Sequence, residues 1–596
     1  MILPALCNYY ARMTRAPGSG MPQQGLSAEK IAYALVLRAD GSLSGILDLQ
    51  ESKGKKKTDR ILSVPKAVKR ASGIAPNFLW DNTGYVLGVD DKGKPERTAL
   101  CFAAFKELHQ QAAREQAHPK LQAVAAFLGN WDPAGFDDLP DVAPKELIGK
   151  NCVFFWDETN EPIHEDPDIL RPVDAGAGGR TGYCLVSGQT RQLARLHPSI
   201  KGVWGGQSSG GSLVSFNLEA FTSYGKEQSY NAPVAEELAE AYTSALNYLL
   251  NRENRRCLQI GDASTVFWAE KESAGEDLLY SLLAEERKGD DEGGDGADLA
   301  ESPSTGRGKR GKGSARSGRT ENTTANTIGT LLTSLKSGIP IDQSLPGIDP
   351  SVRFYVLGLA PNAARISVRF WLPSTFGALA RNIARHYGDI EIEQRFASDP
   401  QYPTLWRLLV DSAVQRKTEN ILPPLASGVF RAMLTGTAYP QSFLQTVVGR
   451  IRADKQITYL RAAAIKGCLV RTFKKEISHM LDETRTDTPY LLGRLFALLE
   501  KAQQDALGTI NATIRDRFIG SASATPSIVF PRLLRMAQHH LAKSEYRARV
   551  EKGIRAVMDN LASFPAHLPL EEQGIFFIGY YHQMNANYKS TAPTEE

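Results

Sequence analysis

One stretch near the middle of the chain is too polar to fold around a core. Residues 285–301 carry eight acidic and two basic side chains, and residues 302–319 carry six basic and no acidic ones. With almost no apolar residue, this stretch buries too little surface to offset the conformational entropy lost on ordering. We therefore predict a disordered polyampholyte linker over residues 285–326. Its basic half is compatible with contact to nucleic acid, and equally with self-neutralisation.

The region before the linker mixes strand and helix patterns. Residues 30–49 contain two β-prone runs around Asp40-Gly41, which is a hairpin signal. A further short strand is expected around Tyr85. Residues 99–130, with a break at His118-Pro119, and residues 234–251 have the apolar spacing of helices. These patterns predict an α+β domain at the N-terminus.

The region after the linker is mainly helical. Residues 351–371 give two strands joined at Pro361-Asn362, and apolar stripes of bundle type recur beyond residue 480. Because 596 residues exceed the size of one hydrophobic core, we expect several domains. The fold class is α+β, with hairpins in a mixed N-terminal region and a C-terminal helical bundle. The predicted parts are an N-terminal domain over 1–284, the linker over 285–326, a middle region over 327–479 and the bundle over 480–596.

Composition excludes some classes of protein and leaves others open. No run of about 18 apolar residues occurs and no basic leader precedes an apolar stretch, so we expect a cytoplasmic protein without a membrane partner. The six cysteines lie far apart and form no Cys/His cluster, so we predict neither a metal site nor a cofactor. The net charge of +4 is too small to indicate a nucleic-acid partner by itself. A nucleic-acid partner must therefore be inferred from where the charges lie along the chain.

The first local excess of positive charge follows the hairpin. Residues 53–70 contain eight basic side chains and one acid, Asp59, and residues 51–60 are predicted to form a mobile loop. Lysines here would neutralise DNA phosphates, and nearby amides would read base edges. The alternative is a solvated loop tip, since lysine-rich hairpin tips are common. The candidate DNA-binding residues are Lys53, Lys55, Lys56, Lys57, Arg60, Lys66, Lys69, Arg70, Asn77 and Asn82.

A second local excess of positive charge lies in the helical half of the chain. Residues 440–479 carry eight basic side chains against Asp454 and Glu476. Several of them are spaced along one or two predicted helices, where they would follow the backbone of a single strand. The candidate strand-tracking residues are Arg450, Arg452, Lys455, Arg461, Lys466 and Arg471.

The stretch from residue 204 to residue 233 has the composition of a binding loop. Glycines and serines dominate its first part, and amides and tyrosines follow. Glycine allows close backbone approach, while amides and aromatic rings offer hydrogen bonds and stacking faces. The alternative is that the amides brace the loop against its own backbone. The candidate binding residues of this loop are Gln207, Ser208, Ser209, Asn217, Tyr224, Gln228 and Asn231.

The same stretch contains GQSSG, which fits the G-x-S-x-G pattern of a nucleophile elbow at Ser208. An elbow requires a strand before the serine and a helix directly after it, yet the following GSLVSFN is strand-like. A serine hydrolase is therefore the alternative function, and we expect a protein that is not an enzyme. A bare scaffold with solvated basic loops is a third interpretation.

Several blocks of sequence resemble one family over nearly the full length. They include MILPALCNYY, PKAVKRASGIAPNFLWDNTGYVLG, GGQSSGGSLVSFNLEAFTSYGKEQSYNAPV, FYVLGLAPNAARISVRFW, RIRADKQITYLRAAAIK and NATIRDRFIGSASATP. In this order they resemble the large signature subunit of the type I-C CRISPR surveillance complex (Cascade).

The resemblance implies a non-catalytic subunit that recognises the protospacer-adjacent motif in duplex DNA, aids unwinding and R-loop formation, and helps recruit the helicase-nuclease. The implied partners are the guide RNA, the double-stranded target with its displaced single strand, and the backbone, handle-binding and small subunits. This fits the rule that base pairing reads the target while protein reads the short motif. The family also implies small subunits made from an internal start, for which Met480 is our candidate.

Overall fold

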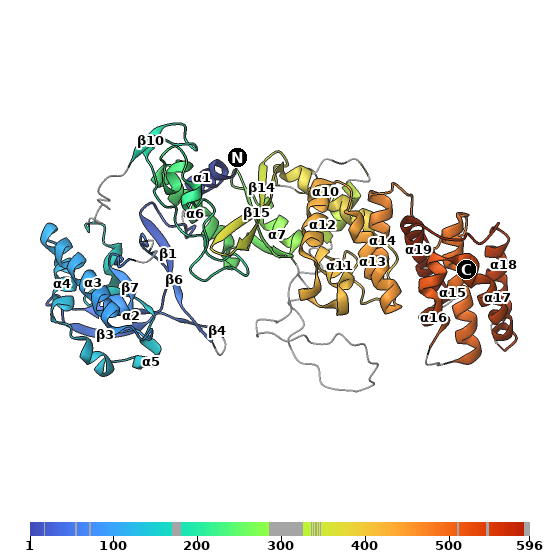
Figure 1. Ribbon diagram of the computed structural model, residues 1–596, viewed down its shortest axis with the longest axis horizontal. Helices are drawn as coiled ribbons and strands as arrows, with labels where there is room; N and C mark the ends of the chain where they lie inside the picture. Colours follow the sequence, from blue (N-terminus) through green and yellow to red (C-terminus); the bar gives the residue numbers. More distant parts are fainter. Residues whose placement is uncertain are drawn as a thin grey trace. The chain divides into compact units, whose positions relative to one another are not determined.

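The computed structural model describes two compact units (Figure 1). The first unit contains Met1–Asn254 and Pro361–Ser367, and the second contains Arg255–Ala360 and Val368–Glu596. The described residues are 1–16, 18–53, 56–68, 70, 73–169, 180–284, 326–334, 337, 339, 343, 345, 347–508, 512–543 and 547–588. The predicted linker over 285–326 lies outside them except for its last residue. The predicted boundaries at 284 and 479 fall within the second unit, and the four-part division stays a prediction.

A sheet in the order β3-β2-β8-β7, with β9 beside β8, forms the centre of the first unit. Strand β2 is buried at every position, is antiparallel to β3 and is parallel to β8. The predicted hairpin turn is confirmed, because Gly41 has φ +81° between β2 and β3. A Cβ there would lie 2.6 Å from the Cβ of Ala126, so glycine also allows a helix to approach the turn. The strands are Tyr33–Leu37 (β2), Leu43–Asp48 (β3), Trp80–Asn82 (β7), Asn151–Trp156 (β8) and Glu161–Pro162 (β9).

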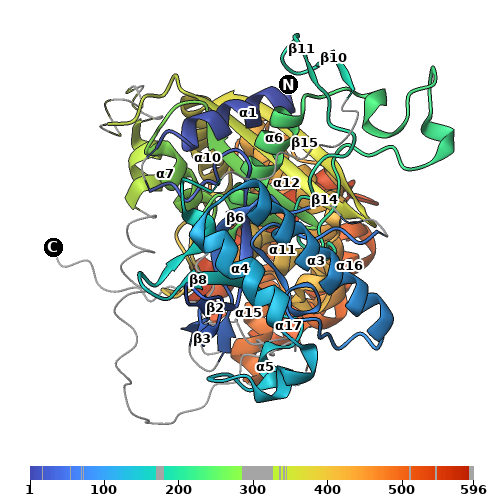
Figure 2. The same ribbon diagram turned by 90° about the vertical axis from the view of Figure 1, so that its left-hand side faces the viewer.

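Two helices pack against this sheet (Figure 2). They are α3 (Pro95–Glu115) and α4 (Pro119–Asn130), and the predicted break between them is confirmed because Pro119 begins α4 after an extended His118. The predicted strand around Tyr85 is wrong. Residues Thr83–Val86 form helix α2, which begins there because the side chain of Asn82 accepts a hydrogen bond from the Gly84 N–H.

Three two-stranded antiparallel ribbons, β1–β6, β4–β5 and β10–β11, and a helix pair complete the described part of the first unit. Residues 51–60 were predicted to be a loop, but β4 pairs with β5 in register, so the prediction is corrected to a strand ribbon. The helix predicted over 234–251 is confirmed as α6, which packs on α1. Figure 2 shows β10 and β11 beside an irregular stretch that leads to α6. The elements are Leu26–Ile31 (β1), Arg60–Pro65 (β6), Glu51–Lys53 (β4), Lys56–Thr58 (β5), Ile2–Met13 (α1), Glu236–Leu250 (α6), Thr181–Tyr183 (β10) and Thr190–Gln192 (β11).

The second unit combines a four-stranded sheet in the order β12-β13-β14-β15 with many helices. The predicted strand pair at residues 351–371 is confirmed as β14 and β15. The strands are Cys257–Ile260 (β12), Ala263–Ala269 (β13), Arg353–Asn362 (β14) and Arg365–Thr375 (β15). The first helices are Gly275–Leu283 (α7), Phe376–Ile390 (α10), Leu405–Ser412 (α11), Pro423–Thr435 (α12), Gln441–Asp454 (α13) and Tyr459–Arg471 (α14).

The C-terminal helices share one hydrophobic core with the helices before them. Helices α15 and α19 approach so closely that a Cβ on Gly493 would lie 2.0 Å from the carbonyl oxygen of Phe576. Helix α19 also packs on α13 and α14. Met480, half exposed, lies before α15, and its use as an internal start stays a prediction. The helices are Thr488–Leu507 (α15), Ile514–Ala524 (α16), Pro526–Leu541 (α17), Arg547–Met558 (α18) and Leu570–Tyr588 (α19).

The predicted fold class, α+β, is confirmed. Mixed sheet and helix form the first unit, and helices dominate from α10 onward. Within the described residues, none of the helices combines the length and the apolar character needed to cross a membrane.

Candidate nucleic-acid interface

The β4–β5 ribbon carries part of the first predicted basic set (Figure 1). In the backbone register of the ribbon Lys53 is paired with Lys56, while Lys55 and Lys69 lie outside the described residues. The Lys57 Nζ lies 2.8 Å from Asp48 and 3.6 Å from Glu146, and the hydrogen bond to Asp48 raises the pKa of Lys57. Arg60 is exposed at the start of β6. An exposed lysine paired at the surface can exchange its partner for a phosphate at small cost.

The remaining members of this set are held by the protein itself. Asn77 is 4% exposed and its Oδ1 accepts a hydrogen bond from the Val68 N–H at 2.8 Å, so base-edge readout by Asn77 is wrong. Asn82 caps helix α2. Arg70 forms an ion pair with Asp81 and lies over the Tyr85 ring.

Lys66 is similarly engaged, because its Nζ lies 3.1 Å from Glu236 and 3.5 Å from Glu240. Both acids belong to helix α6, which lies about 170 residues further along the chain. Lys66 therefore links β6 to α6, and among the described side chains of this set Lys57 and Arg60 are the exposed ones.

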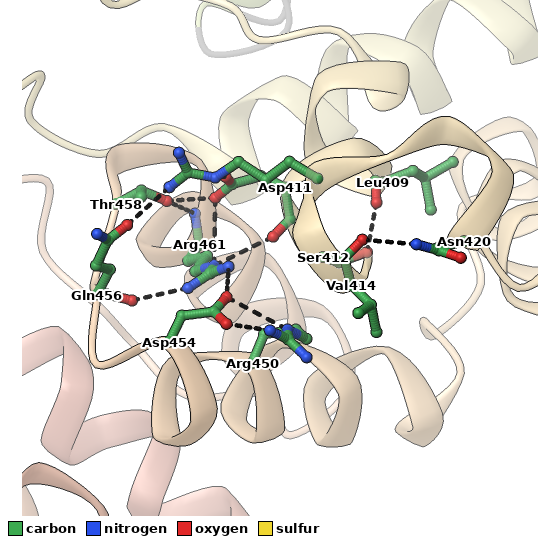
Figure 3. A network of polar contacts seen from close by, with 11 residues as sticks. Leu409, Asp411, Ser412, Val414, Asn420, Arg450, Asp454, Gln456, Thr458 and Arg461 are labelled. Atoms are coloured by element: carbon green, nitrogen blue, oxygen red, sulfur yellow. Dashed lines mark hydrogen bonds and ion pairs between the residues drawn. The ribbon is translucent and has the colours of Figure 1, made fainter. Parts of the chain in front are cut away.

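Several members of the second predicted basic set are engaged in ion pairs with other helices, and Figure 3 shows the network around Arg461. Arg461 is 1% exposed, and its guanidinium pairs with Asp411 at 3.4 Å and with Asp454 at 2.5 Å. Asp454 also pairs with Arg450. The hydroxyl of Thr458 accepts a hydrogen bond from the Arg461 N–H and so caps α14. This network joins the ends of α11 and α13 to the start of α14.

Two further residues of this set are also internal. Lys466 is 5% exposed and its Nζ donates to the carbonyl oxygen of Glu391. Arg471 is 1% exposed, lies 2.7 Å from Asp389 and covers the Tyr439 ring. The prediction that Arg461, Lys466 and Arg471 track a strand is therefore wrong, because α14 is surrounded by other helices and its cations satisfy partners inside the core.

Arg452 and Lys455 are the members of this set that lie nearer the surface. Arg452 is exposed on α13. Lys455 ends that helix in a left-handed conformation with φ +59°, and its Nζ donates to the carbonyl oxygen of Arg452. The described structure leaves these two side chains as the accessible remainder of the predicted strand-tracking set.

The environment of Ser208 is not that of a nucleophile elbow. Ser208 lies in a turn within residues 204–210, and the described residues around it form turns and an isolated bridge between Ile200 and Gly211. The strand expected after it is limited to bridges at Gly211 and Ser212. In this described stretch, no strand precedes the serine directly and no helix follows it. Among all described residues, no group of three or more His, Cys, Asp or Glu could hold a metal ion.

The amides of the 204–233 stretch brace the loop. Asn231 Nδ2 donates to the carbonyl oxygens of Lys226 (2.8 Å) and Gln228 (3.0 Å), and its Oδ1 accepts from the Ser223 N–H (3.2 Å). Asn217 Oδ1 accepts a hydrogen bond from Arg365. Gln228 Oε1 accepts one from Arg195 at 2.9 Å. The side chains of Asn217, Gln228 and Asn231 therefore hydrogen-bond within the protein, as the alternative interpretation of this loop predicted.

The other members of the loop set face outward. Gln207, Ser208 and Ser209 are exposed, and Gln207 lies at the edge of a shallow hollow that Arg365 also lines. Tyr224 is 98% exposed. These four side chains are accessible to a partner.

Sequence reasoning missed the arginines that surround this loop. Arg365 lies over the Phe221 ring at 4.8 Å and Arg252 over the Trp204 ring at 4.6 Å. Arg365 comes from the hairpin tip between β14 and β15, 148 residues from its partner Asn217, so no local pattern could have placed it there. Arg195 precedes the loop in the segment TRQLAR, residues 190–195, where two arginines four residues apart were the available signal.

A basic face on the C-terminal helices was also missed. Residues 526–558 contain seven Lys or Arg against two acids, and their i, i+3 spacing on α17 and α18 was the available signal. All seven are exposed: Arg532, Arg535, Lys543, Arg547, Arg549, Lys552 and Arg555.

Exposed cations therefore lie on or beside the β4–β5 ribbon and next to the polar, glycine-rich 204–233 loop in the described structure. A family model described as CRISPR-associated protein (Cas_Csd1) matches residues 6–588. Because the match covers nearly the whole chain, the chain belongs to the CRISPR-associated Cas_Csd1 family. Membership implies a place in a CRISPR complex with other Cas proteins. The search of curated proteins gave no significant match.

Proposed function

We propose that this chain is the non-catalytic large subunit of a type I-C Cascade complex. In this role it recognises the protospacer-adjacent motif in duplex DNA, aids unwinding and R-loop formation, and helps recruit the helicase-nuclease. The observation that carries the proposal is the family match over residues 6–588, together with exposed cations on and beside the β4–β5 ribbon. Its partners are the guide RNA, the target duplex, the displaced strand and the other subunits.

The physical support comes from how the cations are distributed. Lys57 and Arg60 lie on or beside a narrow two-stranded ribbon, and such ribbons fit the major groove of duplex DNA. Phosphate contacts hold a protein in register on a duplex without reading its sequence. Exposed side chains such as Gln207 in the 204–233 loop supply hydrogen-bonding groups for base edges.

The proposal is tested with the complex assembled on its guide RNA. The wild-type complex is incubated with duplexes that carry the guide-matched segment flanked by random base pairs, and bound duplexes are sequenced. We expect enrichment of one short motif beside the guide-matched segment. Bound duplexes with random flanks would contradict motif recognition.

The contribution of the ribbon is measured with Lys56→Glu, Lys57→Glu and Arg60→Glu combined. We expect about 10-fold weaker duplex binding at 0.1 M salt and a shallower dependence of affinity on salt, because fewer counterions are released. The matched control reverses Lys92 and Lys94, which are exposed cations in the turn before α3. Equal losses in both variants would show that only overall charge matters and would remove the ribbon from the interface.

A further inference from the structure

A two-residue turn at the tip of the 204–233 loop holds an aromatic ring in solvent. Ser223 and Lys226 form an isolated bridge, and the Lys226 N–H donates to the Ser223 carbonyl oxygen at 2.9 Å. Between them, Tyr224 has φ +51° and Gly225 has φ +66°. Two consecutive left-handed residues are the pattern of a type I′ turn, in which Asn-Gly is the favoured pair. Here tyrosine occupies the position of asparagine.

Tyrosine at this position has no compensating contact among the described residues. A left-handed conformation is unfavourable for a side chain with a Cβ, and packing usually offsets it. The Tyr224 ring is 98% exposed, and a Cβ placed on Gly225 would meet no atom within 4 Å. The turn therefore projects into open space and holds its ring away from the protein.

Hydrogen bonds from neighbouring side chains support the backbone of this exposed turn. Asn231 binds the backbone at three points, including the Ser223 N–H and the Lys226 carbonyl oxygen on the two sides of the turn. Gln228, which also has a positive φ of +46°, is fixed by Arg195. These bonds hold the backbone that carries the ring, which reduces the backbone entropy lost when a partner binds.

We propose that Tyr224 stacks on an unpaired base of a bound nucleic-acid strand, a role that rests on the proposed function and adds a named contact to it. An exposed ring without a pocket matches a flat partner, and every nucleobase has such a face. Lys226 is exposed beside the ring, and Arg195 is exposed at the base of the turn, where they can pair with flanking phosphates. A protein partner would instead bury the ring in a pocket of its own, and the assembly control tests that alternative.

The experiment compares Tyr224→Asn with Tyr224→Phe in the assembled complex. Asparagine suits the left-handed turn and removes the ring, whereas phenylalanine keeps the ring and removes the hydroxyl. We expect Tyr224→Asn to bind a target with an unpaired segment about 5- to 100-fold more weakly, which is the range for losing one stacked base. We expect Tyr224→Phe to stay within about 3-fold of wild type, since a phenyl ring stacks as well.

Photo-crosslinking identifies the strand that supplies the base. Complexes are formed with 5-iodouracil in the guide RNA, in the target strand or in the displaced strand, irradiated, and digested for mass spectrometry. A crosslink to Tyr224 from one strand supports the proposal and names the source. Absence of a crosslink from all three strands, with unchanged affinity of Tyr224→Asn, would overturn it.

Two controls separate this inference from other failures. Wild-type complex that shows no motif-dependent binding would contradict the proposed function itself, whereas intact wild-type binding with an indifferent Tyr224→Asn would contradict only the stacking role. Failure of Tyr224→Asn to assemble with the other subunits, without any crosslink, would assign the ring to a protein contact and also overturn the inference. The thermal midpoint of Tyr224→Asn should be no lower than that of wild type, because the turn is preserved.

Discussion

The β4–β5 ribbon and helix α14 are both rich in basic residues in the sequence. Lys57 on the ribbon is exposed in the structure, whereas Arg461 on α14 is buried. Lys57 is exposed on a two-stranded ribbon and pairs with an exposed acid at 2.8 Å. Arg461 is buried in the middle of the second unit and pairs with two acids. A count of charges does not distinguish these situations. Burial and the position of the partner acids do.

The difference has an energetic basis. A buried guanidinium has lost its water, so it is tolerated only where carboxylates and carbonyl oxygens replace that water. An exposed ammonium keeps its water and its mobility, so its pairs contribute little to stability and exchange readily. Basic residues on α14 therefore specify the packing of α11, α13 and α14, while those on the ribbon are available for function.

Removal of the Arg461 guanidinium should give the largest effect. We expect Arg461→Met to lower the free energy of unfolding by about 3 kcal/mol, because buried Asp411 would keep Arg416 as its ion-pair partner but lose Arg461, and the carbonyl oxygens of Asp411 and Gln456 would lose a donor. Urea unfolding of the full chain measures the change. The matched control is Arg452→Met on neighbouring α13, which is exposed and should change stability by about 0.5 kcal/mol or less.

The comparison would break if the Arg461 variant unfolded like wild type but bound a single strand more weakly. In that case the buried network would be dispensable for packing, and the side chain would reach a strand after a rearrangement. Equal destabilisation by Arg452→Met would likewise show that α13 and α14 do not differ as their exposure indicates.

Buried histidines test the contrast between buried and exposed basic side chains through the pH dependence of the free energy of unfolding. Burial lowers the pKa of His386 and of His582 to about 3, and burial lowers that of His109 to about 4. The His109 Nε2 accepts a hydrogen bond from the Leu79 N–H, so protonation there would break a contact. An unfolded chain takes up these protons near pH 6.5, and the folded chain does not.

Their contribution to stability is therefore complete above pH 6.5 and declines as the pH falls toward 3. For His386 the loss should reach about 2 kcal/mol at pH 5. Unfolding free energies measured between pH 5 and 7 should show a smaller slope for His386→Gln than for wild type. His539→Gln, at an exposed position on α17, should keep the wild-type slope, and a parallel flattening in both variants would contradict the assignment.

Much of the fold could be predicted because short stretches of sequence determine where turns and helices begin and end. The turn at Asp40-Gly41 and the helix break at Pro119 follow from residues with restricted or unusual backbone preferences. The strand predicted around Tyr85 was wrong because the side chain of Asn82 accepts a hydrogen bond from the Gly84 N–H and starts a helix there. The loop predicted over residues 51–60 was wrong because lysines on a ribbon lack the apolar alternation by which strands are predicted.

The candidate site was harder to predict, since its geometry depends on distant partners. Asn77 and Arg70 read as polar surface in the sequence, yet Asp81 and the Val68 backbone hold them. Arg365 reaches the 204–233 loop from the β14–β15 hairpin tip. Tyr224 was identified as a candidate, but its left-handed backbone and 98% exposure are properties that only the structure gives.

The smallest predicted effect concerns Lys455, which is intermediate between the exposed and the buried basic residues. Lys455 ends α13 with φ +59°, a conformation that glycine adopts without the steric cost paid by other residues. We expect Lys455→Gly to raise the free energy of unfolding by about 0.5 kcal/mol, since this relief exceeds the extra freedom of the unfolded chain. Lys455→Ala removes the same side chain and keeps a Cβ, so it should be no more stable than wild type. Urea unfolding distinguishes them: equal stabilisation would assign the gain to loss of the charge, and weaker single-strand binding by both variants would place Lys455 with the functional cations.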